Sequence, residues 1–158
     1  MPNLFPVDAG ITQMRGALKI VKDNGGSMGL AELADEAEEK IDDLFPVLDA
    51  CKLLKFAEVK DGKVQLTKEG IGLNLSNMQK VIREKLAEIE PFKTVVVALR
   101  VENNVSTKKL LEVLSGSGIL FFSDQRKSEE ALRKILLKWG VRVKLLYYDQ
   151  ETDSWKLA

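Results

Sequence analysis

The chain has 158 residues, of which 45% are hydrophobic and 30% charged, a composition typical of one globular domain or two very small ones. It contains no histidine, one cysteine and no apolar run of about 18 residues, so histidine-based catalysis, Cys/His zinc sites, intrachain disulfides and membrane insertion are not expected. The net charge is zero, but residues 1–70 carry 9 basic and 13 acidic side chains, and residues 71–158 carry 15 and 11. The lone cysteine and the absence of a secretory signal predict a cytoplasmic protein.

Three helices are predicted at the start of the chain. Apolar residues from Ile11 to Val21 recur at helical spacing in "ITQMRGALKIVKDN", which ends at an Asn-Gly-Gly sequence. A short helix follows in "MGLAELADEA" and a third in "IDDLFPVLDACKLLKF", where Asp42 or Asp43 is expected to cap the first turn.

A hairpin directly follows the third helix. In "FAEVKDGKVQL", apolar and polar residues alternate on both sides of Asp61-Gly62, a pair that readily adopts the positive φ angles of a tight hairpin turn. Thr67 is a good cap for a further helix, with Glu69 in its first turn. Three helices and a two-stranded wing are the order of a winged helix-turn-helix unit.

The middle of the chain also has helical patterns. A capping box of Ser76 and Gln79 is expected to open a helix that stops at Pro91. The following segment, residues 94–102, fits either a strand, because valine favours strands, or a helix. We interpret it as a helix because its position repeats that of the first helix. "STKKLLEVLSGSG" then predicts a short capped helix.

The end of the chain repeats the order of the beginning. "SEEALRKILLKWG" predicts a helix capped by Ser128, and "VRVKLLYY" and "WKL" predict the strands of a second hairpin. The apolar stripe of this helix lies 88 residues after that of the third helix, pairing Leu132, Ile135, Leu136 and Trp139 with Leu44, Val47, Leu48 and Cys51. The predicted fold is mainly α with small β-hairpins (α+β): two tandem winged helix-turn-helix units, 8–75 and 91–158, joined by a helix at 76–90.

Two blocks of sequence, "IDDLFPVLDACKLLKFAEVKDGKVQLTKEG" and "LRKILLKWGVRVKLLYYDQETDSWKL", resemble the C-terminal AAA-associated domain family. The matching residues are Asp42, Asp43, Leu44, Pro46, Phe56, Ala57, Glu58, Leu66, Thr67, Glu69, Gly70, Trp139, Gly140, Tyr148 and Asp149. The resemblance implies a prokaryotic domain that commonly follows the ATPase subunit of ABC importers of the nitrate/sulfonate/taurine type and that also occurs alone. The chain has no G-x-x-x-x-G-K-[ST] phosphate loop, so we expect it to act with such an ATPase as a separate chain.

Acidic residues are concentrated around the third helix. Residues 32–49 hold eight acidic side chains and one basic one, Lys40. They would repel the phosphates of DNA, so this helix is a candidate for protein docking or a solvated face. The candidate acidic docking face comprises Asp35, Glu36, Glu39, Asp42, Asp43 and Asp49.

Basic residues are concentrated in the last helix and after it. This candidate patch for nucleic acid or an acidic partner comprises Arg126, Lys127, Arg133, Lys134, Lys138, Arg142 and Lys144. A solvated helix face is the commonest explanation of such a patch, and self-association with the acidic first unit is another. DNA binding through the helix at 129–139 remains an alternative hypothesis.

No catalytic, metal-binding or cofactor-binding set of residues stands out, so neither an enzyme nor a cofactor is expected. Cys51 lies on the predicted buried stripe and is interpreted as a packed thiol, and the aromatic residues of the second hairpin as core rather than a ligand pocket. The apolar "ILFF" at 119–122 is either core or a partner surface. The predicted function is a non-enzymatic regulatory or interaction module that binds a protein, with a DNA-binding transcriptional regulator as the alternative.

Overall fold

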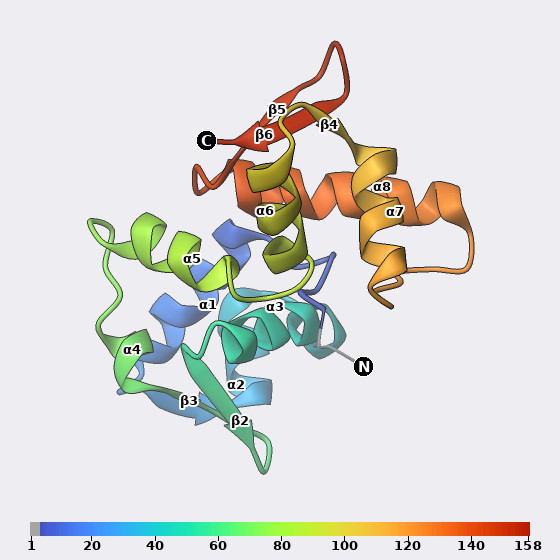
Figure 1. Ribbon diagram of the computed structural model, residues 1–158. Coiled ribbons are helices and arrows are strands. Elements are labelled where there is room, and N and C mark those ends of the chain that lie inside the picture. The colour runs from blue at the N-terminus through green and yellow to red at the C-terminus, as the bar shows by residue number, and fades with distance from the viewer. Residues whose placement is uncertain (1–3) are drawn as a thin grey trace. The chain divides into compact units, whose positions relative to one another are not determined.

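The computed structural model describes residues 4–158, which form two compact units. One unit is Asp8–Met78; the other is Gln79–Ala158 together with residues 4–7. Both are mainly helical, and each contains one small three-stranded antiparallel sheet (Figure 1). The predicted mainly α fold with small β-hairpins is therefore confirmed.

The Asp8–Met78 unit contains four helices and three strands. In chain order they are α1 (Ile11–Asp23), β1 (Ser27–Gly29), α2 (Leu30–Ala37), α3 (Ile41–Leu53), β2 (Ala57–Lys60), β3 (Lys63–Leu66) and α4 (Lys68–Ile71).

The hairpin of β2 and β3 forms as the sequence predicts. Asp61 and Gly62 both have positive φ, 52° and 74°, and Val59 pairs with Val64 across the hairpin. The strand β1, which sequence reasoning missed, pairs with the other edge of β3, so the sheet order is β1-β3-β2. The sheet is thus three-stranded, whereas the sequence predicted a hairpin of two strands.

Helix α3 buries the apolar stripe that its sequence predicts. Leu44, Val47, Leu48 and Cys51 are all at most 4% exposed. The helix ends where Lys55 takes a positive φ of 63° and the N–H of Phe56 donates to the carbonyl of Cys51. The expected cap was wrong, because Lys40 occupies the capping position and both aspartates lie in the first turn.

The remaining elements begin with α5 at the boundary of the two units. They are α5 (Met78–Leu86), α6 (Phe92–Val101), β4 (Val105–Ser106), α7 (Thr107–Gly116), α8 (Gln125–Ile135), the π-helix η1 (Leu136–Val141), β5 (Leu146–Asp149) and β6 (Ser154–Leu157). The sheet order is β4-β6-β5, so a short strand again joins the hairpin. The order α–β–α–α–β–β therefore occurs twice in the chain.

Segment 94–102 lies in a helix over all but its last residue, so the helical interpretation is confirmed. Ser106 caps α7 by accepting from the N–H of Lys109 at 3.1 Å, and Thr67 caps α4 by accepting from that of Gly70 at 3.1 Å. The predicted Ser76 capping box was wrong, because the turn before α5 is held by the side chain of Asn74.

Helix α8 begins earlier than predicted. Asp124 is the cap and accepts from the N–H groups of Arg126 and Lys127. The predicted cap, Ser128, is instead 4% exposed, and its hydroxyl donates to the carbonyl of Phe122 and accepts from the N–H of Phe122, both at 3.0 Å. This residue therefore fixes the segment before the helix.

The predicted strand over 141–148 begins only at Leu146, because α8 continues into the π-helix. The two helix ends are otherwise alike: Lys144 has a φ of 62°, and the N–H of Leu145 donates to the carbonyl of Gly140. This ending lies 89 residues after that of α3, whereas the apolar stripes lie 88 residues apart. The π-helix accommodates the one additional residue.

Aromatic side chains form much of the core of the second unit. Trp139 and Trp155 are fully buried, and Phe5 packs edge-on against Trp139 with ring centroids 4.6 Å apart. The N–H of Phe5 also donates to the carbonyl of Glu90. Sequence reasoning missed this contribution, because an isolated phenylalanine in an irregular segment carries no periodic signal. No helix within residues 4–158 is both long and apolar enough to cross a bilayer.

Candidate interaction surfaces

The predicted acidic docking face lies on α2, on α3 and between them. Five of its six residues are exposed, and Glu39 is half-buried. Glu39, Asp42 and Asp43 line a depression of about 570 Å³ together with Asp8 and Glu38. Asp35, Glu36 and Asp49 do not line it. No group of three side chains within residues 4–158 is arranged to hold a metal ion.

Two exposed apolar side chains accompany these acids on α3. Ile41 is 40% and Phe45 47% exposed, and their spacing of four residues places them on one side of the helix. Asp42 and Asp49 lie on the same side by helical spacing, opposite the buried stripe. We refer to Ile41, Asp42, Phe45 and Asp49 as the α3 face. Sequence reasoning named the acids but not the apolar pair.

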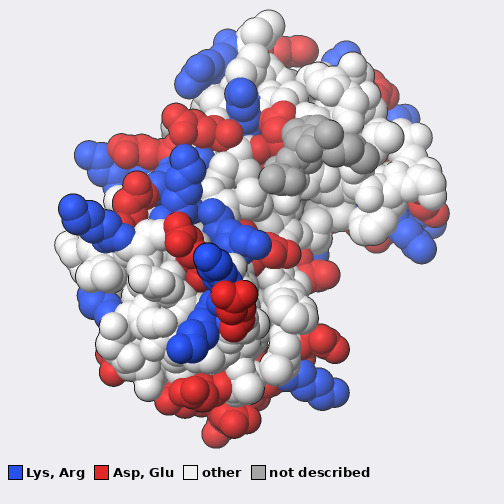
Figure 2. Space-filling view, turned by 90° about the horizontal axis from the view of Figure 1, so that it is seen from below, with Lys and Arg blue, Asp and Glu red and all other residues white. Residues whose placement is uncertain are grey.

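The basic residues near α8 do not form one uncompensated patch. Arg133 is held by two carboxylates: its Nη2 lies 3.1 Å from Glu129 Oε1 and its Nε 3.5 Å from Asp153 Oδ1. Lys138 is half-buried, whereas the other five residues of the predicted patch are exposed. On the face seen in Figure 2, basic and acidic side chains are interspersed rather than separated.

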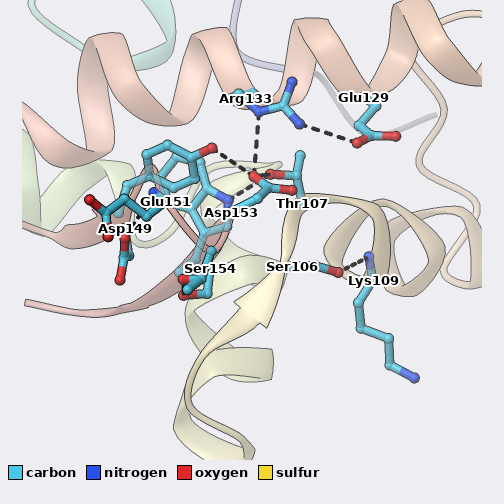
Figure 3. A network of polar contacts seen from close by, with 12 residues as sticks. Ser106, Thr107, Lys109, Glu129, Arg133, Asp149, Glu151, Asp153 and Ser154 are labelled. Carbon is cyan, nitrogen blue, oxygen red and sulfur yellow. Dashed lines mark hydrogen bonds and ion pairs between the residues drawn. The ribbon is translucent and has the colours of Figure 1, made fainter.

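Asp153 is the centre of a polar network that joins three elements (Figure 3). Its Oδ1 accepts hydrogen bonds from Thr107 Oγ1 and Tyr148 Oη, both at 2.7 Å, in addition to the contact with Arg133. Thr107 is fully buried and also accepts from Trp155 Nε1 at 2.8 Å. We refer to Asp153, Thr107, Tyr148 and Arg133 as the Asp153 hub.

The hub shifts the pKa values of its members. Burial alone would raise the pKa of Asp153, but hydrogen bonds from Tyr148 and Thr107 and the charge of Arg133 outweigh it and lower that pKa. Burial and the bond to Asp153 raise the pKa of Tyr148. Through these contacts the hub fixes the second hairpin against α7 and α8.

Two further features singled out by sequence lie wholly or partly in the core. Cys51 is 1% exposed, and burial raises the pKa of its thiol to about 12, as expected for a packed thiol rather than a nucleophile. In the "ILFF" segment, Ile119 is buried whereas Leu120 and Phe122 are 57% and 53% exposed. This segment therefore contributes to both the core and the surface.

Residues 31–149 match the profile of the C-terminal AAA-associated domain family, which covers most of the chain. The chain belongs to this family. The match spans both units, from α2 to β5, and includes the α3 face and the basic residues of α8. No curated protein sequence matches the chain significantly.

Proposed function

We propose that the chain is a non-enzymatic interaction module of two winged-helix units that docks onto a protein through the α3 face. The supporting observation is the composition of that face, on which the exposed Ile41 and Phe45 lie beside Asp42 and Asp49. Exposed apolar side chains one helical turn apart are suited to the groove of a protein partner. The flanking carboxylates favour a partner with lysine or arginine around that groove.

The same face is poorly suited to DNA. In a winged helix that reads DNA, the third helix enters the major groove and its exposed side chains meet base edges and phosphates. Carboxylates at these positions repel the phosphate backbone, and the apolar pair offers no hydrogen bonds to base edges. Protein docking is therefore the better use of α3.

The proposed partner is the ATPase subunit of an ABC importer. The family description refers to AAA proteins, and the sequence resembles domains that accompany importer ATPases of the nitrate/sulfonate/taurine type. The module would regulate or locate the ATPase rather than hydrolyse ATP, because the chain has no phosphate loop.

The test is affinity purification of the tagged full chain from its native cells, followed by calorimetric titration with the purified ATPase. We expect an ABC ATPase subunit to be recovered, and Phe45→Ser to weaken its affinity at least about tenfold, as for a buried aromatic anchor. Phe122→Ser is the matched control, because Phe122 is 53% exposed but belongs to the other unit and is not part of the α3 face. Failure to recover an ATPase, or unchanged affinity of Phe45→Ser, contradicts the proposal.

DNA binding by the second unit is the alternative function. It is supported by the exposed cations Arg126, Lys127, Lys134, Arg142 and Lys144. Fluorescence polarisation with a labelled duplex at low salt tests it: DNA binding predicts affinity that falls steeply as salt is raised. Absence of salt-sensitive binding removes this alternative.

A further inference from the structure

A groove of about 910 Å³ lies between α1 and the chain from Gly70 to Met78, within the Asp8–Met78 unit. One wall is a row of cations on α1, Arg15, Lys19 and Lys22. The other wall is mainly apolar and includes Leu73 and Leu75. The volume lies within the range of small-molecule sites, which is roughly 300–1,000 Å³.

The cations of the groove are largely uncompensated. The side chains of Arg15 and Lys22 make no hydrogen bond or ion pair with any residue within 4–158, and no acidic residue lines the groove. Lys19 lies 2.9 Å from Asp23, but both side chains are more than 60% exposed, so this pair is weak. The groove therefore presents net positive charge beside an apolar wall.

The apolar wall of the groove includes a leucine that is largely exposed to solvent. Leu75 is 80% exposed, while Leu73 and Leu18, at 7% each, form the apolar base of the groove. Exposed apolar side chains beside an apolar depression mark surfaces that bind an apolar group.

Gly16 provides an independent indication that something approaches α1 closely. It lies in the middle of the helix and lines the groove, where glycine destabilises a helix relative to alanine. A Cβ atom at this position would meet nothing within 4 Å, and φ is not positive, so neither packing nor backbone geometry requires glycine. The absence of a side chain keeps the floor of the groove open between Arg15 and Lys19.

We propose that this groove binds an amphiphilic anion of the long-chain carboxylate class. The carboxylate pairs with Arg15 or Lys22, the chain crosses the open surface above Gly16, and its methylene groups pack against Leu18, Leu73 and Leu75. The groove and the α3 face consist of different residues, so this site is independent of the proposed protein docking. The bound amphiphile would be a ligand of the module in addition to its protein partner.

The test uses sodium dodecanoate, below its micelle concentration, with the isotope-labelled full chain. We expect dose-dependent shifts of the backbone amide signals of Gly16, Leu73 and Leu75. Dodecanol should bind at least about fivefold more weakly, because it lacks the charge, and dodecyltrimethylammonium should produce no shifts at these amides. Equal binding of all three compounds, or no shifts with dodecanoate, overturns the proposal.

Three variants separate binding from folding. Gly16→Leu should abolish binding by filling the groove while the melting temperature does not fall, because leucine is the better helix former. Leu75→Ser and Arg15→Gln should each weaken binding about three- to tenfold, and Lys63→Gln on β3 is the matched control with unchanged binding. Retained affinity in a folded Gly16→Leu contradicts the proposed site. So does binding of an acidic amphipathic peptide at these amides in the absence of dodecanoate binding, because the occupant would then be a protein segment.

Discussion

The two units have the same order of elements but fasten the hairpin to the second helix in different ways. In the first unit, the N–H of Leu30 at the start of α2 donates to the carbonyl of Gly62 in the hairpin turn at 2.9 Å. In the second unit, the corresponding contact is made by side chains, with Thr107 at the start of α7 donating to Asp153 at 2.7 Å. A short Asp-Gly turn can be held by the backbone alone, whereas the longer turn of the second unit is anchored by a charged side chain.

This difference extends to the exposed face of the third helix. At the spacing of 88 residues, Ile41 and Phe45 correspond to Glu129 and Arg133. The second pair forms an ion pair and reaches the hub, whereas the first pair faces solvent. One helix therefore uses these positions to hold its own hairpin. The other leaves them available to a partner, which is why we place the docking surface on α3.

The largest expected effect is the loss of stability when a closely packed glycine in either unit is replaced by alanine. A Cβ at Gly70 would lie 2.0 Å from the backbone carbonyl oxygen of Phe56, whereas one at Gly140 would lie 2.6 Å from Cδ1 of the Leu146 side chain. Backbone cannot move as readily as a side chain. We expect Gly70→Ala to destabilise the chain by about 3 kcal/mol or more and Gly140→Ala by about 1–2 kcal/mol.

Urea denaturation followed by far-UV circular dichroism measures both variants, with wild type as reference. Tryptophan fluorescence distinguishes the units, because both tryptophans, Trp139 and Trp155, belong to the second one. Equal losses of stability in the two variants would show that a clash with the Phe56 backbone costs no more than a clash with the Leu146 side chain.

The next largest effect is expected from substitutions in the two hairpin turns, which compare anchoring by side chains with anchoring by the backbone. Asp153→Ala removes the shared acceptor of Thr107, Tyr148 and Arg133, and we expect a loss of about 2 kcal/mol in the unfolding free energy. Asp61→Ala is the matched control, because Asp61 also has a positive φ, 52° against 47° for Asp153, but turns a hairpin that the backbone holds. We expect a loss of about 1 kcal/mol or less there.

Tryptophan fluorescence during urea denaturation is the measurement for Asp153→Ala, since Trp155 is bonded to Thr107 in the hub. Hydrogen exchange of the β2 and β3 amides reports on Asp61→Ala. If Asp153→Ala costs no more than Asp61→Ala, the hub does not anchor the second hairpin.

Features with a local physical cause were predictable from the sequence. The Asp61-Gly62 turn needs two positive φ angles, and the stripe from Leu44 to Cys51 follows helical spacing, so both could be predicted. The strand expected from Val141 failed because the preceding helix continues through it, and the N–H of Val143 donates to the carbonyl of Trp139. Tertiary context overrode the β-propensity of valine there.

Features that depend on distant partners were not predictable. Strands β1 and β4 have three and two residues, too few for an alternating pattern, and they form because an edge of the hairpin is available to pair with them. Among the candidate site residues, the acids around α3 were predictable from composition alone. The ion pair between Arg133 and Asp153 was not predictable, because the two residues are 20 positions apart and meet only in the folded unit.

Near neutral pH the two units are not expected to differ in their response to pH, but away from it they should respond differently. The pKa of Asp153 is lowered on folding, so its stabilising contribution is present above its unfolded value of about 3.9 and is lost as pH falls through the folded value. The pKa of Tyr148 is raised, so its contribution is present below about pH 10 and is lost as pH rises. In the first unit, the pKa of Cys51 is raised to about 12, so stability there declines between about pH 9 and pH 12.

Urea midpoints measured by tryptophan fluorescence from pH 2 to pH 7 test the loss of stability of the second unit at low pH, which we call the acidic limb of its stability curve. Asp153→Asn should flatten this limb, because it removes the titrating carboxylate and retains a side chain suited to positive φ. Amide exchange of α3 from pH 8 to pH 11, corrected for intrinsic rates, tests the alkaline decline, which Cys51→Ala should reduce. An acidic limb unchanged by Asp153→Asn would mean that other carboxylates control the acid response. The hairpin of the second unit would then still be anchored by different contacts from that of the first. The charge of Asp153 would not, however, contribute measurably to the stability of the second unit.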